Sequence, residues 1–121
     1  MQKQKYDLED RLIEYASKIS DVVDALPNTR LGNYLAGQMI RSGTSPALHY
    51  GEAQSAESQA DFIHKMKVCL KELRETFIGL KLIKRKEIIE NNDMLEKIIK
   101  ENNELISIFV TSIKTARNNK K

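Results

Sequence analysis

Residues 41–58, RSGTSPALHYGEAQSAES, carry small and polar side chains where an amphipathic helix carries large apolar ones. The stretch contains Pro46 and two of the five glycines of the chain. The sequence before it, from 31 to 39, and the sequence from Phe62 onward keep the apolar spacing of helices. A proline inside a helix removes one backbone hydrogen bond and bends the axis. We therefore predict a helix that continues to about Glu52, bends near Pro46 and packs closely against a neighbour.

Apolar residues recur at steps of three and four through four segments, which is the spacing of amphipathic helices. Helices are predicted at about 7–26, 30–53, 59–86 and 93–117, with a disordered basic tail at 118–121. Pro27 ends the first helix, and Ser58 with Asp61 forms a capping box that starts the third. Because the links are short, the fold class is an all-α, antiparallel up-down-up-down four-helix bundle, with residues 1–121 as one domain.

The third and fourth predicted helices carry the clearest core patterns. The third has two apolar rows, one of them through Met66, Cys69 and Leu73, so it is expected to contact two neighbouring helices. On the fourth, Asn102 interrupts the apolar stripe at a core position. A buried polar residue at such a position can fix helix register or oligomeric state, and we expect one of those roles here.

The composition indicates a cytoplasmic protein. Charged residues make up 31% of the chain and the mean hydropathy is −0.49. No apolar stretch approaches the roughly 20 residues of a membrane span. The first five residues have no apolar core behind them, so no secretory signal is expected. Cys69 is the single cysteine, which provides no disulfide and suits a reducing compartment.

A stripe of polar residues follows the second predicted helix at steps of three and four. Its members are Gln38, Arg41, Ser45, His49 and Glu52, and Glu72 and Glu75 on the third helix are candidate partners for Arg41. Two interpretations stay open: a buried or interfacial hydrogen-bond network, and a catalytic or ligand-binding row. The opposite charges of Arg41 and Glu52 favour the network, because buried charges need partners.

Catalytic and metal sites find little support in the sequence. His49 and Glu52 could share one face of a helix, but a di-iron bundle needs Glu-x-x-His elements, and the chain contains none. Cys69 lies on the core seam, and the serines have no evident base and orienting group. No phosphate-binding glycine loop is present. We therefore expect no enzymatic activity, no metal and no cofactor.

Charge is unevenly distributed along the chain. Residues 1–60 hold 6 basic and 8 acidic side chains, whereas residues 61–121 hold 14 basic and 9 acidic. The second half is therefore either an ordinary solvated surface or a candidate nucleic-acid-binding surface that contacts the phosphate backbone. The candidate residues are Lys67, Lys71, Arg74, Lys81, Lys84, Arg85, Lys86, Lys97, Lys100, Lys114 and Arg117.

Several stretches together resemble a known family, the four-helix-bundle proteins encoded in intervening sequences of bacterial 23S ribosomal RNA. The matching elements are Arg41, the Ser45-Pro46 step, residues 49–52, residues 58–62 and the LKEL stretch at 70–73. One departure is His49, where the family usually has Asn. The resemblance extends over nearly the whole chain.

The resemblance carries its own expectations. It implies a homopentamer with a central channel, in a family most of whose members have no known activity. It also implies, through relatives that accompany diversity-generating retroelements, binding to a reverse transcriptase and its RNA by a basic surface.

Two function hypotheses follow. The first is a non-enzymatic, homo-oligomeric interaction module, encoded in the manner of the intervening-sequence proteins. The alternative is an accessory protein that binds RNA or DNA and a reverse transcriptase. Neither hypothesis involves a membrane or a small-molecule substrate.

Overall fold

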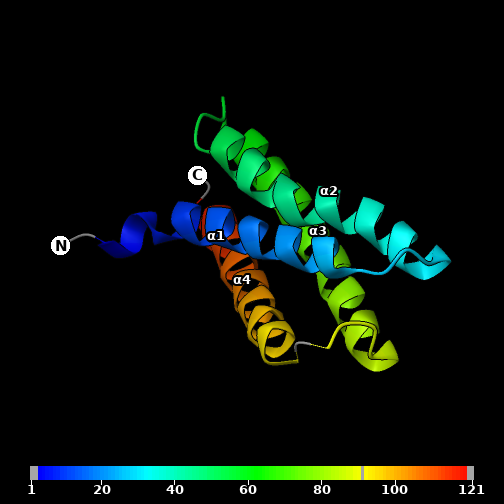
Figure 1. Ribbon diagram of the computed structural model, residues 1–121. Coiled ribbons are helices and arrows are strands. Elements are labelled where there is room, and N and C mark those ends of the chain that lie inside the picture. The colour runs from blue at the N-terminus through cyan, green and yellow to red at the C-terminus, as the bar shows by residue number, and fades with distance from the viewer. Residues whose placement is uncertain (1–2, 91, 120–121) are drawn as a thin grey trace.

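Four helices make up the part of the chain that the computed structural model describes, residues 3–90 and 92–119, and no strand occurs there. They are α1 (Lys3–Ala25), α2 (Arg30–Ala53), α3 (Gln59–Lys86) and α4 (Asn92–Asn118) (Figure 1). The predicted all-α four-helix bundle is thus confirmed. The helix α1 begins at Lys3, four residues before the predicted start at residue 7. Of the predicted tail, Asn118 ends α4, and residues 120–121 lie outside the described residues.

Side-chain caps explain where α2 and α3 begin. The Thr29 hydroxyl accepts a hydrogen bond from the Gly32 amide at 2.9 Å. The Ser58 hydroxyl accepts one from the Asp61 amide at 3.0 Å, and the Asp61 carboxylate accepts one from the Glu57 amide at 3.2 Å. The capping box predicted at Ser58 is therefore present, although its return bond reaches one residue further back than the standard pattern.

The helices contact one another unequally. α2 and α3 share the most extensive contact, whereas α1 and α4 share the least, and Figure 1 shows those two axes crossing rather than running side by side. α3 contacts both α2 and α4, as its two apolar rows predicted. α3 and α4 run antiparallel, because Lys84 pairs with Glu96 at 2.5 Å while Gln59 donates to the Ala116 carbonyl at the opposite ends.

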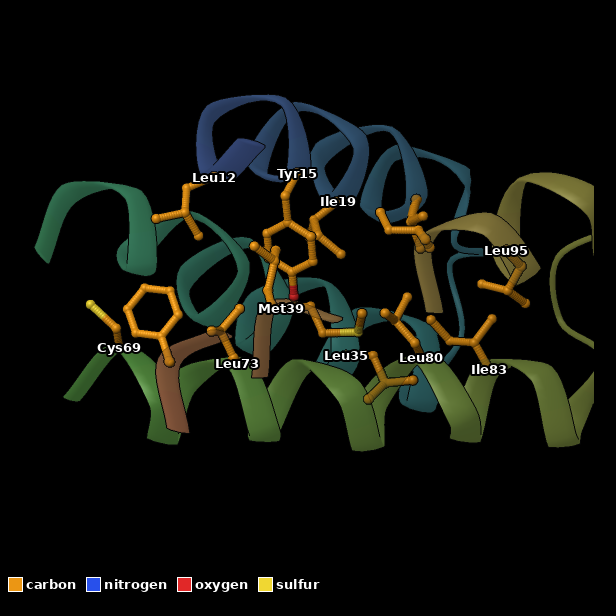
Figure 2. Close-up of a cluster of buried hydrophobic side chains, with 14 of the residues drawn as sticks. Leu12, Tyr15, Ile19, Leu35, Met39, Cys69, Leu73, Leu80, Ile83 and Leu95 are labelled. Atoms are coloured by element: carbon orange, nitrogen blue, oxygen red, sulfur yellow. The ribbon is translucent and has the colours of Figure 1, made fainter. Parts of the chain in front are cut away.

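The core consists of apolar side chains from all four helices. Figure 2 shows the Tyr15 ring directed from α1 toward the centre of this cluster, near Met39 of α2 and Leu73 of α3. Gly43 allows α1 and α2 to approach, because a Cβ atom at this position would lie 2.5 Å from Ile19 Cγ2. The small residues of the 41–58 stretch thus do permit close packing. α2 continues through Pro46, and the bend there stays a prediction.

Candidate interaction surfaces

A layer of buried polar side chains crosses the bundle, with one member from each helix. Ser42 Oγ of α2 lies 2.7 Å from Thr76 Oγ1 of α3, and the Asn102 side-chain amide of α4 donates to the Tyr15 hydroxyl of α1. The two pairs lie next to each other, because the Thr76 side chain is close enough to the Tyr15 phenol to oppose the rise in its pKa that burial causes. All four side chains are at most 2% exposed. Asn102 is therefore buried as predicted. The apolar spacing also puts Tyr15 and Thr76 at core positions of their helices, whereas Ser42 was not predicted to be buried.

The polar stripe predicted on α2 is not a buried network within one chain. Arg41 is exposed, and its guanidinium donates to the Gln38 side chain of the same helix instead of a carboxylate on α3. Glu72, a predicted partner of Arg41, lies 3.4 Å from His49 Nδ1. The inner face of α2 belongs to Ser42, Gly43 and Pro46, so helical geometry turns the stripe outward.

The remaining members of the predicted stripe are also near the surface. Glu52 is exposed and Ser45 is half-buried. Among the described residues, neither side chain has a hydrogen-bond partner or an ion pair. The structure therefore brings together Gln38 with Arg41 and His49 with Glu72, and leaves Ser45 and Glu52 apart.

An apolar surface lies on the outer side of α2 and α3, and we call it the α2–α3 face. It consists of Tyr34 and Leu48 of α2, which are 62% and 69% exposed, and Ile78 of α3, which is 62% exposed. Tyr34, Ile78 and Leu82 line one groove of about 410 Å³, with Leu35 and Met39 also in its wall. Tyr34 and Leu35 both have the apolar spacing of their helix, but Leu35 takes the core position and Tyr34 is exposed.

Two glycines of α2 lie on its exposed side. A Cβ atom at Gly37 or at Gly51 would have no atom within 4 Å, in contrast to Gly43. No contact within the chain therefore requires these two positions to be small.

All eleven candidate nucleic-acid-binding residues are exposed. Lys84 pairs with Glu96, Lys97 lies 3.9 Å from Asp93, and the Lys81 ammonium lies 5.0 Å from the Phe77 ring centroid. Among the described residues the other eight have no carboxylate partner: Lys67, Lys71, Arg74, Arg85, Lys86, Lys100, Lys114 and Arg117.

Ionisable groups of the core favour their neutral forms. Burial raises the pKa of the Cys69 thiol to about 12, and the carboxylates of Glu72 and Glu52 act in the same direction. Burial also raises the pKa of Tyr15. No cluster of histidine, cysteine and carboxylate side chains in the described part of the chain has the arrangement of a metal site.

A second groove, of about 490 Å³, lies between α1 and α4, with Tyr15, Met94 and Ile98 in its wall. Its charged rim is arranged in pairs along each helix: Lys18 with Glu14 at 3.0 Å, and Lys97 near Asp93. Glu101 also lines the groove, and its carboxylate pairs with Arg11 at 2.7 Å, so each charge of the rim already has an opposite charge beside it. No helix in the described residues combines the length and apolarity that crossing a bilayer requires.

Comparison with known proteins identifies the family to which this four-helix chain belongs. A family model described as 23S rRNA-intervening sequence protein matches residues 4–111. The chain is 34% identical to a protein of unknown function from the S23 ribosomal protein family of Bacteroides thetaiotaomicron, whose crystal structure superimposes with a TM-score of 0.80. That similarity covers 88% of this chain and 98% of the other. No curated protein matches the chain. By sequence and by fold, the chain belongs to the 23S rRNA-intervening sequence protein family.

Proposed function

We propose that this chain is a non-enzymatic interaction module that assembles with copies of itself through the α2–α3 face. The observation that carries the proposal is the exposure of Tyr34 and Ile78 around one groove. Single exposed apolar residues are ordinary, but residues that gather around a hollow mark an interaction surface. Burying them in an assembly would be favourable by about 25 cal/mol per Å² of apolar area.

The exposed glycines of α2 support the same surface. A glycine inside a helix is about 1 kcal/mol less favourable than alanine. Gly37 and Gly51 meet nothing within their own chain, so the close approach of a second chain would explain their size. The number of subunits comes from the family resemblance, which implies five. Five identical subunits close into a ring when the groove of each copy receives a different surface of the next.

Light scattering on a sizing column tests self-association directly. The native chain is expected to elute as a multimer of about five copies, from the family resemblance and ring closure. Ile78→Asp places a charge in the groove and should give monomers with an unchanged helical circular dichroism spectrum. Ile13→Asp is the matched control, because Ile13 is 53% exposed on α1, outside the groove. A monomeric native chain, or an Ile78→Asp variant that stays multimeric, would contradict the proposal.

A second candidate function, binding to RNA or DNA, rests on the unpaired cations of α3 and α4. Lys67 and Arg74 are spaced seven residues apart on α3, and so they share one side of that helix. The antiparallel alignment of the two helices brings the end of α4, with Lys114 and Arg117, beside the first half of α3, where Arg117 lines a groove with Ile63. A ring of copies would multiply this field, and phosphate binding strengthens with the number of cations.

Fluorescence anisotropy with a labelled RNA oligonucleotide tests this second function. Replacing Lys67, Arg74 and Lys114 by Glu should weaken binding and flatten its dependence on salt, because fewer counterions are released. Lys18→Glu is the matched control, since Lys18 lies on α1 and already pairs with Glu14. If Lys18→Glu weakens RNA binding as much as the triple variant does, binding is not localised to the surface of α3 and α4. A reverse transcriptase, the partner that the resemblance adds, is tested by co-purification with the same variants.

A further inference from the structure

We propose that the buried polar layer is a register lock: it selects one alignment of the helices along their axes and disfavours alignments shifted by a heptad. The layer consists of Tyr15, Ser42, Thr76 and Asn102, one from each helix. This role is independent of what the assembled protein binds.

The hydrogen bonds form two neighbouring pairs. The Asn102 amide donates to the Tyr15 oxygen. The Thr76 hydroxyl donates to the Glu72 backbone carbonyl at 3.0 Å, so its own oxygen is free to accept from Ser42. Thr76 also lies close to the Tyr15 phenol, so the two pairs keep their places only while all four helices keep their present alignment.

The apolar core by itself does not distinguish this alignment from shifted ones. A shift of α1 against α4 by seven residues would place Val22 opposite Asn102 and Phe109 opposite Tyr15. Apolar residues would still meet apolar residues where the two axes cross, because the apolar pattern repeats along both helices. Asn102 and Tyr15 would each lose their buried partner, and a buried polar group without a partner is strongly disfavoured.

Each member of the layer is a polar residue at a heptad position that is otherwise mostly apolar in its helix. Seven residues before and after each member, the side chains are almost all apolar. They are Leu8 and Val22 for Tyr15, Leu35 and His49 for Ser42, Cys69 and Ile83 for Thr76, and Leu95 and Phe109 for Asn102. A shift of any helix past its neighbour therefore breaks the layer.

The α1–α4 contact depends most on this lock. It is the least extensive contact of the bundle, so interlocking side chains constrain its alignment least. A further polar contact between these two helices is the surface ion pair of Arg11 with Glu101 at 2.7 Å and with Glu104 at 3.0 Å. Asn102 Oδ1 is buried and has no hydrogen-bond partner among the described residues, so leucine at this position would remove an unpaired polar atom. We infer that Asn102 acts here by selecting one alignment rather than by adding stability.

The first experiment replaces Asn102 by Leu and records amide NMR spectra. The expected result is an unchanged or higher melting temperature together with extra or broadened amide peaks, because stability is kept while one alignment is no longer selected. Asn103→Leu is the matched control, since Asn103 is the exposed neighbour of Asn102, and it should keep one peak per amide. A single sharp set of peaks in Asn102→Leu would overturn the proposal.

Thiol crosslinking with a short bis-maleimide then identifies the alignment, in a background with Cys69→Ala. The pair Arg11→Cys and Glu104→Cys reports the present alignment, because these residues form an ion pair and the reagent spans the gap that the shorter cysteine side chains leave. The pair Lys18→Cys and Glu104→Cys reports the alignment shifted by a heptad. With Asn102 intact only the first pair should crosslink within the chain, whereas with Asn102→Leu both should. Absence of the second crosslink in Asn102→Leu would also overturn the proposal.

A double variant covers the case in which Asn102→Leu does not fold. Tyr15→Phe with Asn102→Leu removes both hydrogen-bonding groups, so no partner is left unsatisfied between α1 and α4. This variant is expected to fold and to form both crosslinks. If it also fails to fold, or folds in the present alignment alone, the layer is a requirement for stability and does not select the register.

Discussion

The inner and outer faces of α2 carry similar residues for different reasons. Gly43 on the inner face leaves room for Ile19, whereas Gly37 and Gly51 on the outer face have no neighbour within the chain. Ser42 is buried and bonded to Thr76, while Ser45 is half-buried and has no side-chain partner among the described residues. Small size on one face is explained by the fold of a single chain. On the other face it points to a contact with a second chain.

The largest effect is expected at the inner glycine. In Gly43→Ala the new methyl group would lie 2.5 Å from Ile19 Cγ2, so α1 or α2 must shift. Overpacking of this kind lowers the free energy of unfolding by about 1–3 kcal/mol. Denaturant titration followed by circular dichroism measures the change. Unaltered stability would mean that the α1–α2 contact is looser than the structure has it.

A smaller loss is expected at the inner serine. Ser42→Ala removes one hydrogen bond to Thr76 within the buried layer and should lower the free energy of unfolding by about 1 kcal/mol. Ser45→Ala is the matched control on the same helix and should stay within about 0.5 kcal/mol of the native chain. Thermal melts of the two variants compare them. Equal losses would show that burial does not separate the two serines.

The outer glycine should respond in the opposite direction. Gly37→Ala adds a methyl group in open space and raises the helix propensity of α2. The free energy of unfolding of the dissociated chain should rise by about 0.5–1 kcal/mol. Self-association should weaken at the same time, because the added methyl group keeps a second chain further away. Melting at low protein concentration and light scattering separate the two effects. Stronger self-association would argue against close packing at Gly37.

The smallest effect at neutral pH concerns Cys69, whose thiol donates to the Pro46 carbonyl of α2 at 3.6 Å. Because burial raises the pKa of this thiol to about 12, it should not react with a disulfide reagent at pH 8. Leu48→Cys in a Cys69→Ala background places the thiol on the outer face, where 69% of the native side chain is exposed, and should react at once. Rapid labelling of folded Cys69 would contradict the contact with α2.

The same thiol makes stability depend on alkaline pH. In the unfolded chain it loses its proton near its ordinary pKa of 9.0, whereas in the folded chain it keeps the proton to about pH 12. The unfolded state then binds fewer protons, so the free energy of unfolding falls as the pH rises through this interval. Tyr15, whose pKa is also raised by burial, acts in the same direction. Cys69→Ala should show a shallower alkaline decline in a series of denaturant titrations.

Helix bounds could be predicted closely from the sequence, because caps and stop signals act within a few residues. The ends of α2 and α3 fall at the predicted residues, set by Thr29, Ser58 and the run from Lys84 to Lys86. The start of α1 was predicted at residue 7 because an aspartate there is a residue type that often caps a helix, but α1 already begins at Lys3. The local sequence does not distinguish an aspartate that caps a helix from one that lies inside it.

The candidate surfaces could be predicted less well. The spacing of Gln38, Arg41 and His49 correctly defines one stripe of α2, but spacing does not state which stripe faces the core. Arg41 was expected beside Glu72, and the structure places His49 there. The apolar spacing suits both Tyr34 and Leu35, and only packing shows that Leu35 occupies the core while Tyr34 is exposed.

The sequence by itself determined the all-α class, the helices of the described residues and the burial of Cys69 and Asn102. Those features follow from local propensity and from the period of the apolar pattern. Only the tertiary structure decided which polar groups meet. Ser42 and Thr76 are 34 residues apart in sequence, and Tyr15 and Asn102 are 87 apart. Their pairing depends on how each helix is rotated and aligned against its neighbours, and a repeating apolar pattern leaves that alignment open until the side chains pack.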